Sequence, residues 1–114
     1  MSHWLDTLAY CFGGAFLANA IPHWVAGLMG EPFQTPFADP PGKGLSSSTL
    51  NVWWAAFNFL AAYLLLAQVG AFDWHAFEDI GAAGAGALLM SLVASRIFGR
   101  LHGGLAPRSG SLRD

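Results

Sequence analysis

The polar residues with the most suggestive spacing lie inside a long apolar stretch, at residues 19–23 (NAIPH). On a helix, Asn19 and His23 lie four residues apart and share one face. Pro22 lacks a backbone N–H and clashes with the preceding turn, so it predicts a kink that frees the carbonyl of Ala18. Because polar groups at membrane depth are costly and often functional, this segment is the first candidate for a polar site. The plainer interpretation is an interfacial histidine bonded to a carbonyl.

The four histidines raise the question of haem or metal binding. His23 and His102 are expected at similar depth, where two imidazoles could ligate one haem. Near the opposite face, a second group of side chains could hold a divalent cation: His3, Asp6, Asp73, His75, Glu78 and Asp79. Neither a CxxCH nor an HExxH motif is present, and acidic loop residues are most often simply solvated. We therefore expect no cofactor, and keep haem or a divalent metal as a less favoured alternative.

A lone lysine, Lys43, lies between Gly42 and Gly44 just before a predicted helix start. A lysine beside a helix N-terminus can meet a phosphate group. The GxxxxGK[ST] pattern of a nucleotide-binding loop is absent, so a lipid headgroup is the better candidate ligand. The sequence predicts a lipid-headgroup contact at Lys43 at most, and otherwise an ordered loop without a ligand.

The composition indicates which kind of protein carries these residues. The chain has 114 residues, of which 54% are hydrophobic and only 11% are charged. Soluble domains carry about 25% charged residues and small ones bury the smallest fraction of their surface, so lipid is the solvent that fits. A formal net charge of −2 gives no support for nucleic-acid binding. We expect an all-α integral membrane protein.

Three stretches are long and apolar enough to cross a bilayer, which takes about 20 residues. They cover residues 4–29, 50–69 and 80–98, and the first would be kinked at Pro22. Together they predict a single three-span membrane domain over residues 1–102. The Gly-, Ser- and Arg-rich segment 103–114 is expected to be a disordered tail.

The loop between the first two stretches is rich in proline and serine. Its four prolines forbid a continuous helix and favour extended or turn backbone: Pro32, Pro36, Pro40 and Pro41. The run Ser46-Ser47-Ser48-Thr49 supplies a helix N-cap for the second span. The loop is therefore predicted to be an ordered cap on the bundle.

The basic residues predict the orientation of the three spans. All five lie on the side of the first loop and the C-terminus: Lys43, Arg96, Arg100, Arg108 and Arg113. Positive charge gathers on the cytoplasmic side of membrane proteins. We expect the N-terminus outside and the C-terminus in the cytoplasm, in the cytoplasmic (inner) membrane of a bacterium.

Small and amide side chains predict where the helices touch. In the second span, Asn51, Ala55, Asn58 and Ala62 fall on one face. In the third span, Ala83, Ala87, Ser91 and Ser95 form a stripe with a spacing of four. Membrane helices associate through such small residues and through interhelical hydrogen bonds. These stripes favour a homo-oligomer or a larger membrane-protein partner.

The sequence leaves three functions open. The favoured one is a non-enzymatic module that oligomerises, or docks on a membrane complex, through Asn58 and the stripe Ala83–Ser95. The second is an oligomeric channel or small transporter lined by Asn51, Asn58 and the segment Asn19–His23. The third is a membrane enzyme, or a haem- or metal-binding protein, centred on His23. No Ser/His/Asp arrangement recommends catalysis, so the first function is preferred.

Overall fold

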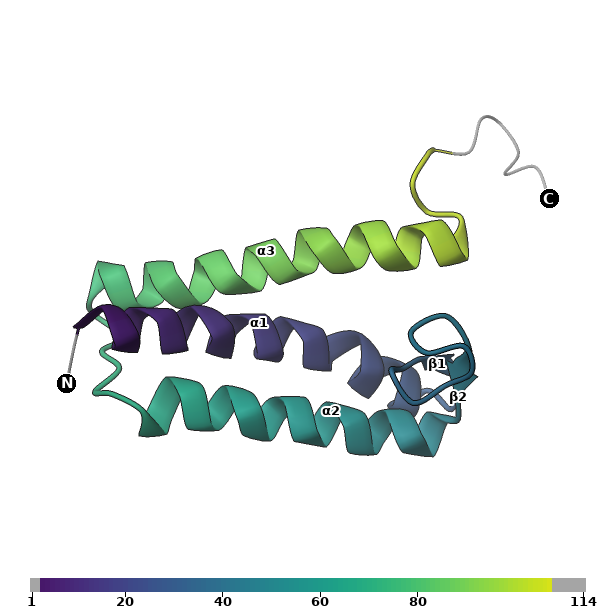
Figure 1. Cartoon of the computed structure of the whole chain (residues 1–114), viewed down its shortest axis with the longest axis horizontal. Helices are drawn as coiled ribbons and strands as arrows, with labels where there is room; N and C mark the ends of the chain where they lie inside the picture. The colour runs from purple at the N-terminus through teal and green to yellow at the C-terminus, as the bar shows by residue number, and fades with distance from the viewer. Residues whose placement is uncertain (1–2, 108–114) are drawn as a thin grey trace.

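The computed structural model describes residues 3–107, which form three long helices and a small two-stranded sheet (Figure 1). Helix α1 covers His3–Leu28, and strands β1 (Phe33–Gln34) and β2 (Leu45–Ser46) follow it. Helix α2 covers Ser48–Tyr63 and continues as a π-helical segment, η1, over Leu64–Gln68. Helix α3 covers Phe77–His102. Of the predicted tail, residues 108–114 lie outside the described part of the chain.

Two of these helices are long and apolar enough to cross a membrane. They are Ser48–Gln68, with mean hydropathy 1.5, and Phe77–His102, with mean hydropathy 1.6. Only 22% of the most apolar window of the first is buried in the chain, and only 6% of that of the second. The core helix of a soluble protein would be mostly buried, so these exposed apolar surfaces suggest a membrane environment. Helix α1 is not one of the two helices that meet this criterion of length and apolarity.

Helix α1 lies between the other two and packs against both (Figure 1). Its contact with α3 depends on two glycines that oppose backbone carbonyls. A Cβ atom on Gly14 would lie 1.9 Å from the carbonyl oxygen of Ala83, and one on Gly86 would lie 1.8 Å from that of Cys11. Real Cβ atoms do not approach so closely, so this reciprocal contact requires glycine at both positions.

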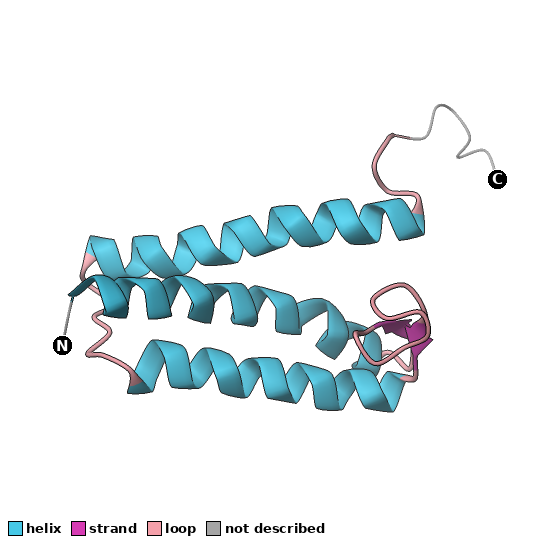
Figure 2. Cartoon of the chain, in the orientation of Figure 1, coloured by secondary structure: helices cyan, strands magenta, loops and turns pink. Residues whose placement is uncertain are grey.

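The loop between α1 and α2 forms an ordered cap at one end of the bundle (Figure 2). Strands β1 and β2 pair in antiparallel fashion, with Phe33 opposite Ser46 and Gln34 opposite Leu45. The hydroxyls of Thr35 and Ser46 share a hydrogen bond that ties the two arms together. As the prolines predicted, the loop contains extended and turn backbone and no helix.

The helix ends follow the local chemistry of the sequence. Ser47 caps α2, because its hydroxyl accepts a hydrogen bond from the backbone N–H of Leu50 at 3.1 Å, which confirms the predicted serine cap. Helix α3 carries Glu78 and Asp79 in its first turn and Arg100 in its last turn. These charges have the signs that stabilise a helix dipole.

Candidate functional site

Asn51 is the centre of the polar network at the loop end of the bundle. Its side chain is fully buried, at 0% exposure. The two hydrogens of its Nδ2 are shared among the backbone carbonyls of Phe33 (3.1 Å), Ser46 (3.3 Å) and Ser47 (3.0 Å). Its Oδ1 lies 2.8 Å from Nδ1 of His23. One amide thus joins both arms of the loop to α1 and to the start of α2.

These contacts decide which nitrogen of His23 carries the proton. Carbonyl oxygens only accept, so Nδ2 of Asn51 faces the carbonyls and Oδ1 faces His23 as an acceptor. The donor in the contact between them is therefore Nδ1–H of His23. In the neutral ring Nε2 is then an unprotonated acceptor. Within residues 3–107, Nε2 has no hydrogen-bond partner.

A second amide contact lies one turn earlier along α1 and about two turns further along α2. Nδ2 of Asn58 donates to the carbonyl of Trp54 at 2.7 Å, so Oδ1 of Asn58 accepts from Nδ2 of Asn19 at 2.9 Å. Asn58 is 0% exposed. Oδ1 of Asn19 has no partner among the described residues. The predicted pair Asn19 and His23 therefore presents two hydrogen-bond acceptors on one face of α1.

Aromatic rings surround the imidazole of His23. Phe33, Trp54 and Phe98 contact it edge-to-face, with ring centroids 5.4, 6.3 and 6.2 Å away. The histidine itself is only 2% exposed. This shell keeps the imidazole in an apolar environment, where an unpaired polar atom is costly and a ligand's hydrogen bond is strengthened.

A pocket of about 360 Å³ opens beside this network. Its polar lining comes from Asn19, His23, Gln34 and Thr35, and its remaining lining from Pro36, Pro41, Gly42, Trp54, Ile97 and Phe98. None of these lining residues is charged. We call this the polar pocket.

His102, the other histidine considered for haem ligation, also lies at this end of the bundle. Its Nε2 is 2.9 Å from Oε1 of Gln34. The ring of Phe33 contacts both His23 and His102, with centroids 5.4 Å from each. Phe98 likewise contacts both imidazoles. Aromatic side chains therefore pack against both histidines, and the structure adds no support for a shared haem.

Most of the acidic side chains at the opposite end make local contacts, whereas Oδ1 of Asp6 is buried without a partner among the described residues. His3 pairs with Glu78 at 3.2 Å. Asp79 accepts the backbone N–H of Asp73, and Asp73 accepts that of His75, both at 2.9 Å. Within residues 3–107 no group of three or more His, Cys, Asp or Glu side chains is arranged to hold a metal ion.

The small-residue stripe of α3 is divided between two environments. Ala83 packs against Gly14, whereas Ser91 and Ser95 are exposed. The hydroxyls of both serines bond carbonyls of their own helix, those of Ala87 and Leu92. The stripe therefore contributes to packing within the chain only at its first half, and its role between chains stays a prediction.

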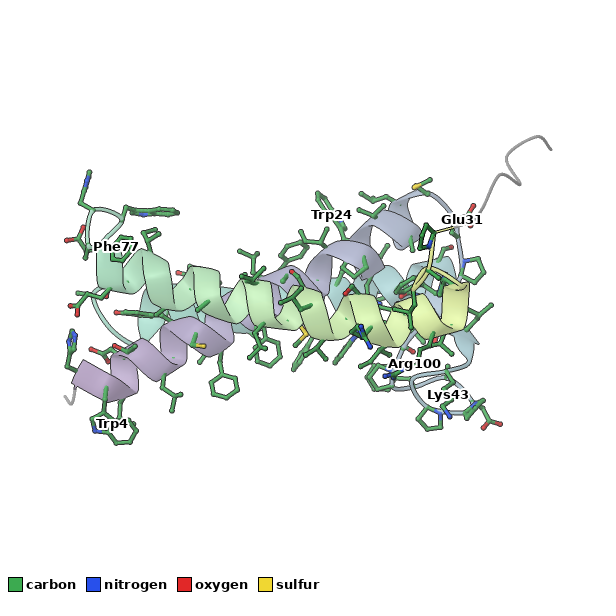
Figure 3. The ribbon with its side chains drawn as sticks, turned by 90° about the horizontal axis from the view of Figure 1, so that it is seen from above. Trp4, Trp24, Glu31, Lys43, Phe77 and Arg100 are labelled. Atoms are coloured by element: carbon green, nitrogen blue, oxygen red, sulfur yellow. The ribbon has the colours of Figure 1, made fainter. Side chains whose placement is uncertain are left out.

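Charged and aromatic side chains mark the two ends of the molecule. Lys43 and Arg100 lie at the loop end, and Trp4 and Phe77 lie at the other end (Figure 3). Lys43 is exposed, so it is accessible to a headgroup, and it makes no contact with the polar pocket.

Several residues of the pocket were not recognised from the sequence. Gln34 and Thr35 lie in the loop, where no periodicity indicates which side chains point inward. Trp54 and Phe98 were expected only as parts of the predicted spans 50–69 and 80–98. These residues come close to the predicted polar segment only after the loop folds back over α1 and α3. Nothing in their sequence positions indicates this proximity.

No protein-family model, curated protein or solved structure matches this chain.

Proposed function

We propose that this chain is a three-span membrane protein with no enzymatic activity, which associates through α3 with another membrane-spanning helix. The observation that carries the proposal is the exposure of α3. Only Asp79 and Gly86 are buried among its 26 residues. Its exposed apolar side chains, among them Leu88, Leu92 and Ile97, need lipid or a protein partner.

The first helix supports the three-span topology by its position. His3 at the start of α1 pairs with Glu78 at the start of α3, while the end of α1 leads into the loop at the other end. Its 26 residues extend about 39 Å, which exceeds a hydrocarbon core of about 30 Å. If α2 and α3 cross the membrane, α1 crosses with them. Its polar residues Asn19 and His23 bond α2 and are kept from lipid.

The predicted orientation and kink belong to the same proposal. Lys43, Arg96 and Arg100 are the basic residues of the described chain, and Lys43 and Arg100 gather at the loop end (Figure 3). By the positive-inside rule this end faces the cytoplasm, in a bacterial inner membrane, and the N-terminus lies outside. Helix α1 continues through Pro22, where the missing N–H favours a kink beside the polar pocket.

The contact surface proposed on α3 centres on Ser91 and Ser95. Both serines are exposed and line a shallow groove with Ala18, Ile21 and Pro22 of α1. Small side chains allow another helix to approach closely, which is the main source of helix association in lipid.

The test replaces both serines with leucine. We expect the wild-type protein in lipid nanodiscs to have a mass above that of its 12.1 kDa chain, as measured by native mass spectrometry. Ser91→Leu with Ser95→Leu should reduce the association constant about fivefold, since about 1 kcal/mol of packing is lost. Ala56→Leu, on an exposed position of α2, is the matched control and should associate as wild type.

Two results would count against the proposal. One is a wild-type monomer that also captures no membrane protein when solubilised from its native membrane. The other is an unchanged mass distribution in the double-serine variant.

The channel alternative receives less support from the geometry. Asn51 and Asn58, its proposed lining, are both 0% exposed and bonded within the chain. Their amides join α1 to α2, and a pore between copies would have to be lined by other residues.

A further inference from the structure

An apolar groove runs along α1 and ends beside the polar pocket. One face of α1 forms its floor, with Leu8, Cys11, Phe12, Ala15, Phe16 and Asn19. Its sides come from Trp54 and Asn58 of α2 and from Gly86, Leu89, Met90 and Val93 of α3. The groove has a volume of about 490 Å³. Asn19 and Trp54 line both the groove and the polar pocket, so the two spaces are adjacent.

The groove has the size of a lipid chain. The floor from Leu8 to Asn19 covers eleven residue steps, or about 16 Å of helix. This is about half of the hydrocarbon core of a bilayer, which is the depth of one leaflet. The lining side chains are apolar except at the end formed by Asn19 and Asn58. An acyl chain that enters from the loop end would therefore meet apolar contacts along its length.

The polar pocket determines what kind of headgroup would accompany that chain. Nε2 of His23 and Oδ1 of Asn19 are two acceptors on residues that lie about 6 Å apart along the axis of α1. Acceptors bind hydroxyl donors, and two of them fit adjacent hydroxyls on one molecule. His23 and Thr35 are each 2% exposed and Gln34 is 6% exposed, so the site is built from buried polar groups.

The uncharged lining of the polar pocket and the groove favours a neutral ligand. No lysine, arginine, aspartate or glutamate lines either the polar pocket or the groove. An isolated phosphate or ammonium group buried there would lose its hydration without gaining a counter-charge. A phospholipid headgroup is therefore disfavoured inside the pocket.

We propose that the polar pocket and the groove bind one uncharged, hydroxyl-bearing amphiphile, with the chemistry of an acylglycerol. Its hydroxyls donate to His23 and Asn19, its head lies between Trp54 and Phe98, and its acyl chain follows α1 towards Leu8. The site requires only that the protein lies in a bilayer, and is independent of association through α3.

The experiment uses the fluorescence of Trp54, which lines both spaces. Trp4, Trp24, Trp53 and Trp74 are replaced by phenylalanine, since all four are at least 44% exposed. The protein is reconstituted in phosphatidylcholine nanodiscs and titrated with a monoacylglycerol that is brominated in the head-proximal part of its chain. Bromine quenches tryptophan only near contact, so saturable quenching reports occupancy. A phosphatidylcholine with the same brominated chain measures quenching by ordinary surrounding lipid.

We expect the monoacylglycerol to quench Trp54 saturably, and the brominated phosphatidylcholine to quench it weakly and without saturation. Ala15→Phe fills the groove without touching the polar pocket, and should weaken apparent binding about tenfold. Ala56→Phe, which adds the same ring at an exposed position outside both spaces, should bind as wild type. His23→Leu removes an acceptor and should weaken binding about tenfold, while His23→Gln, which offers both a donor and an acceptor, should retain most of it.

Equal quenching by the two brominated lipids would overturn the proposal, because it would identify only the surrounding bilayer. Unchanged binding in Ala15→Phe would overturn it as well, whether or not the His23 variants fold. A protein that neither self-associates nor captures a membrane partner, but binds the probe saturably, would contradict association through α3 and leave this site intact.

Discussion

At the scale of single residues, the buried amide side chains of Asn51 and Asn58 make the hydrogen bonds that connect α1, the loop and α2. Asn51 contacts three backbone carbonyls and the imidazole of His23, so it joins three segments that are separate in the sequence: α1, β1 and the junction of β2 with α2. Asn58 makes two such contacts. Because Asn51 has more hydrogen-bond partners than Asn58, it should contribute more to the stability of the protein.

We expect Asn51→Leu to lower the free energy of unfolding by at least about 2 kcal/mol, because several buried polar groups lose their partners together. Asn58→Leu should cost about 1 kcal/mol, close to the average for a hydrogen bond between membrane helices. Gln68→Leu is the control, since Gln68 is exposed and bonds only the exposed Tyr63. Unfolding by sodium dodecyl sulfate in mixed micelles measures all three. Similar values for Asn51→Leu and Gln68→Leu would contradict this view of the network.

At the scale of the elements, the arrangement of α1 and α3 depends on glycines that face carbonyls. Gly86 fits against Cys11 with no space for a methyl group, whereas a Cβ on Gly84, two residues earlier, would meet nothing within 4 Å. Gly86 is therefore the test position, and Gly84 in the same helix is its control.

Gly86→Ala should force α1 and α3 apart and destabilise the protein by about 1–3 kcal/mol, as overpacking does in other cores. Gly84→Ala should be neutral or stabilising by up to about 1 kcal/mol, because alanine has the higher helix propensity. The same unfolding titration compares the two variants. A Gly86→Ala protein at least as stable as Gly84→Ala would show that the helices do not pack as described.

At the scale of the whole molecule, the helical architecture follows from composition and the length of the apolar stretches. The predicted face of Asn51, Ala55, Asn58 and Ala62 comprises the buried residues of α2, because the spacing alone places them together. The π-helical end of α2 and the strands of the loop were not predicted. Two-residue strands have no periodicity to detect, and they form here because Asn51 and the hydroxyl pair of Thr35 and Ser46 hold the two arms together.

The packing of α3 could be predicted only in part. Its stripe from Ala83 to Ser95 is visible in the sequence, and Ala83 does meet Gly14, but Gly86, where a Cβ would collide with the carbonyl of Cys11, lies beside that stripe. Spacing identifies which small residues share a face, whereas the partner's carbonyl positions decide which of them is needed. The polar pocket was beyond sequence reasoning for a related reason, since four separate segments must meet to form it: α1, the loop, α2 and α3.

The central claim is that three helices cross the membrane with the loop end in the cytoplasm. The measurement is labelling of single cysteines, introduced at His3, Lys43 or His75 in a Cys11→Ala background, with a membrane-impermeant maleimide in intact bacterial cells. We expect the cysteines at His3 and His75 to react from outside, and the one at Lys43 to react only after the membrane is permeabilised. If the cysteine at His3 instead behaves like the one at Lys43, α1 does not cross the membrane and the three-span topology is wrong.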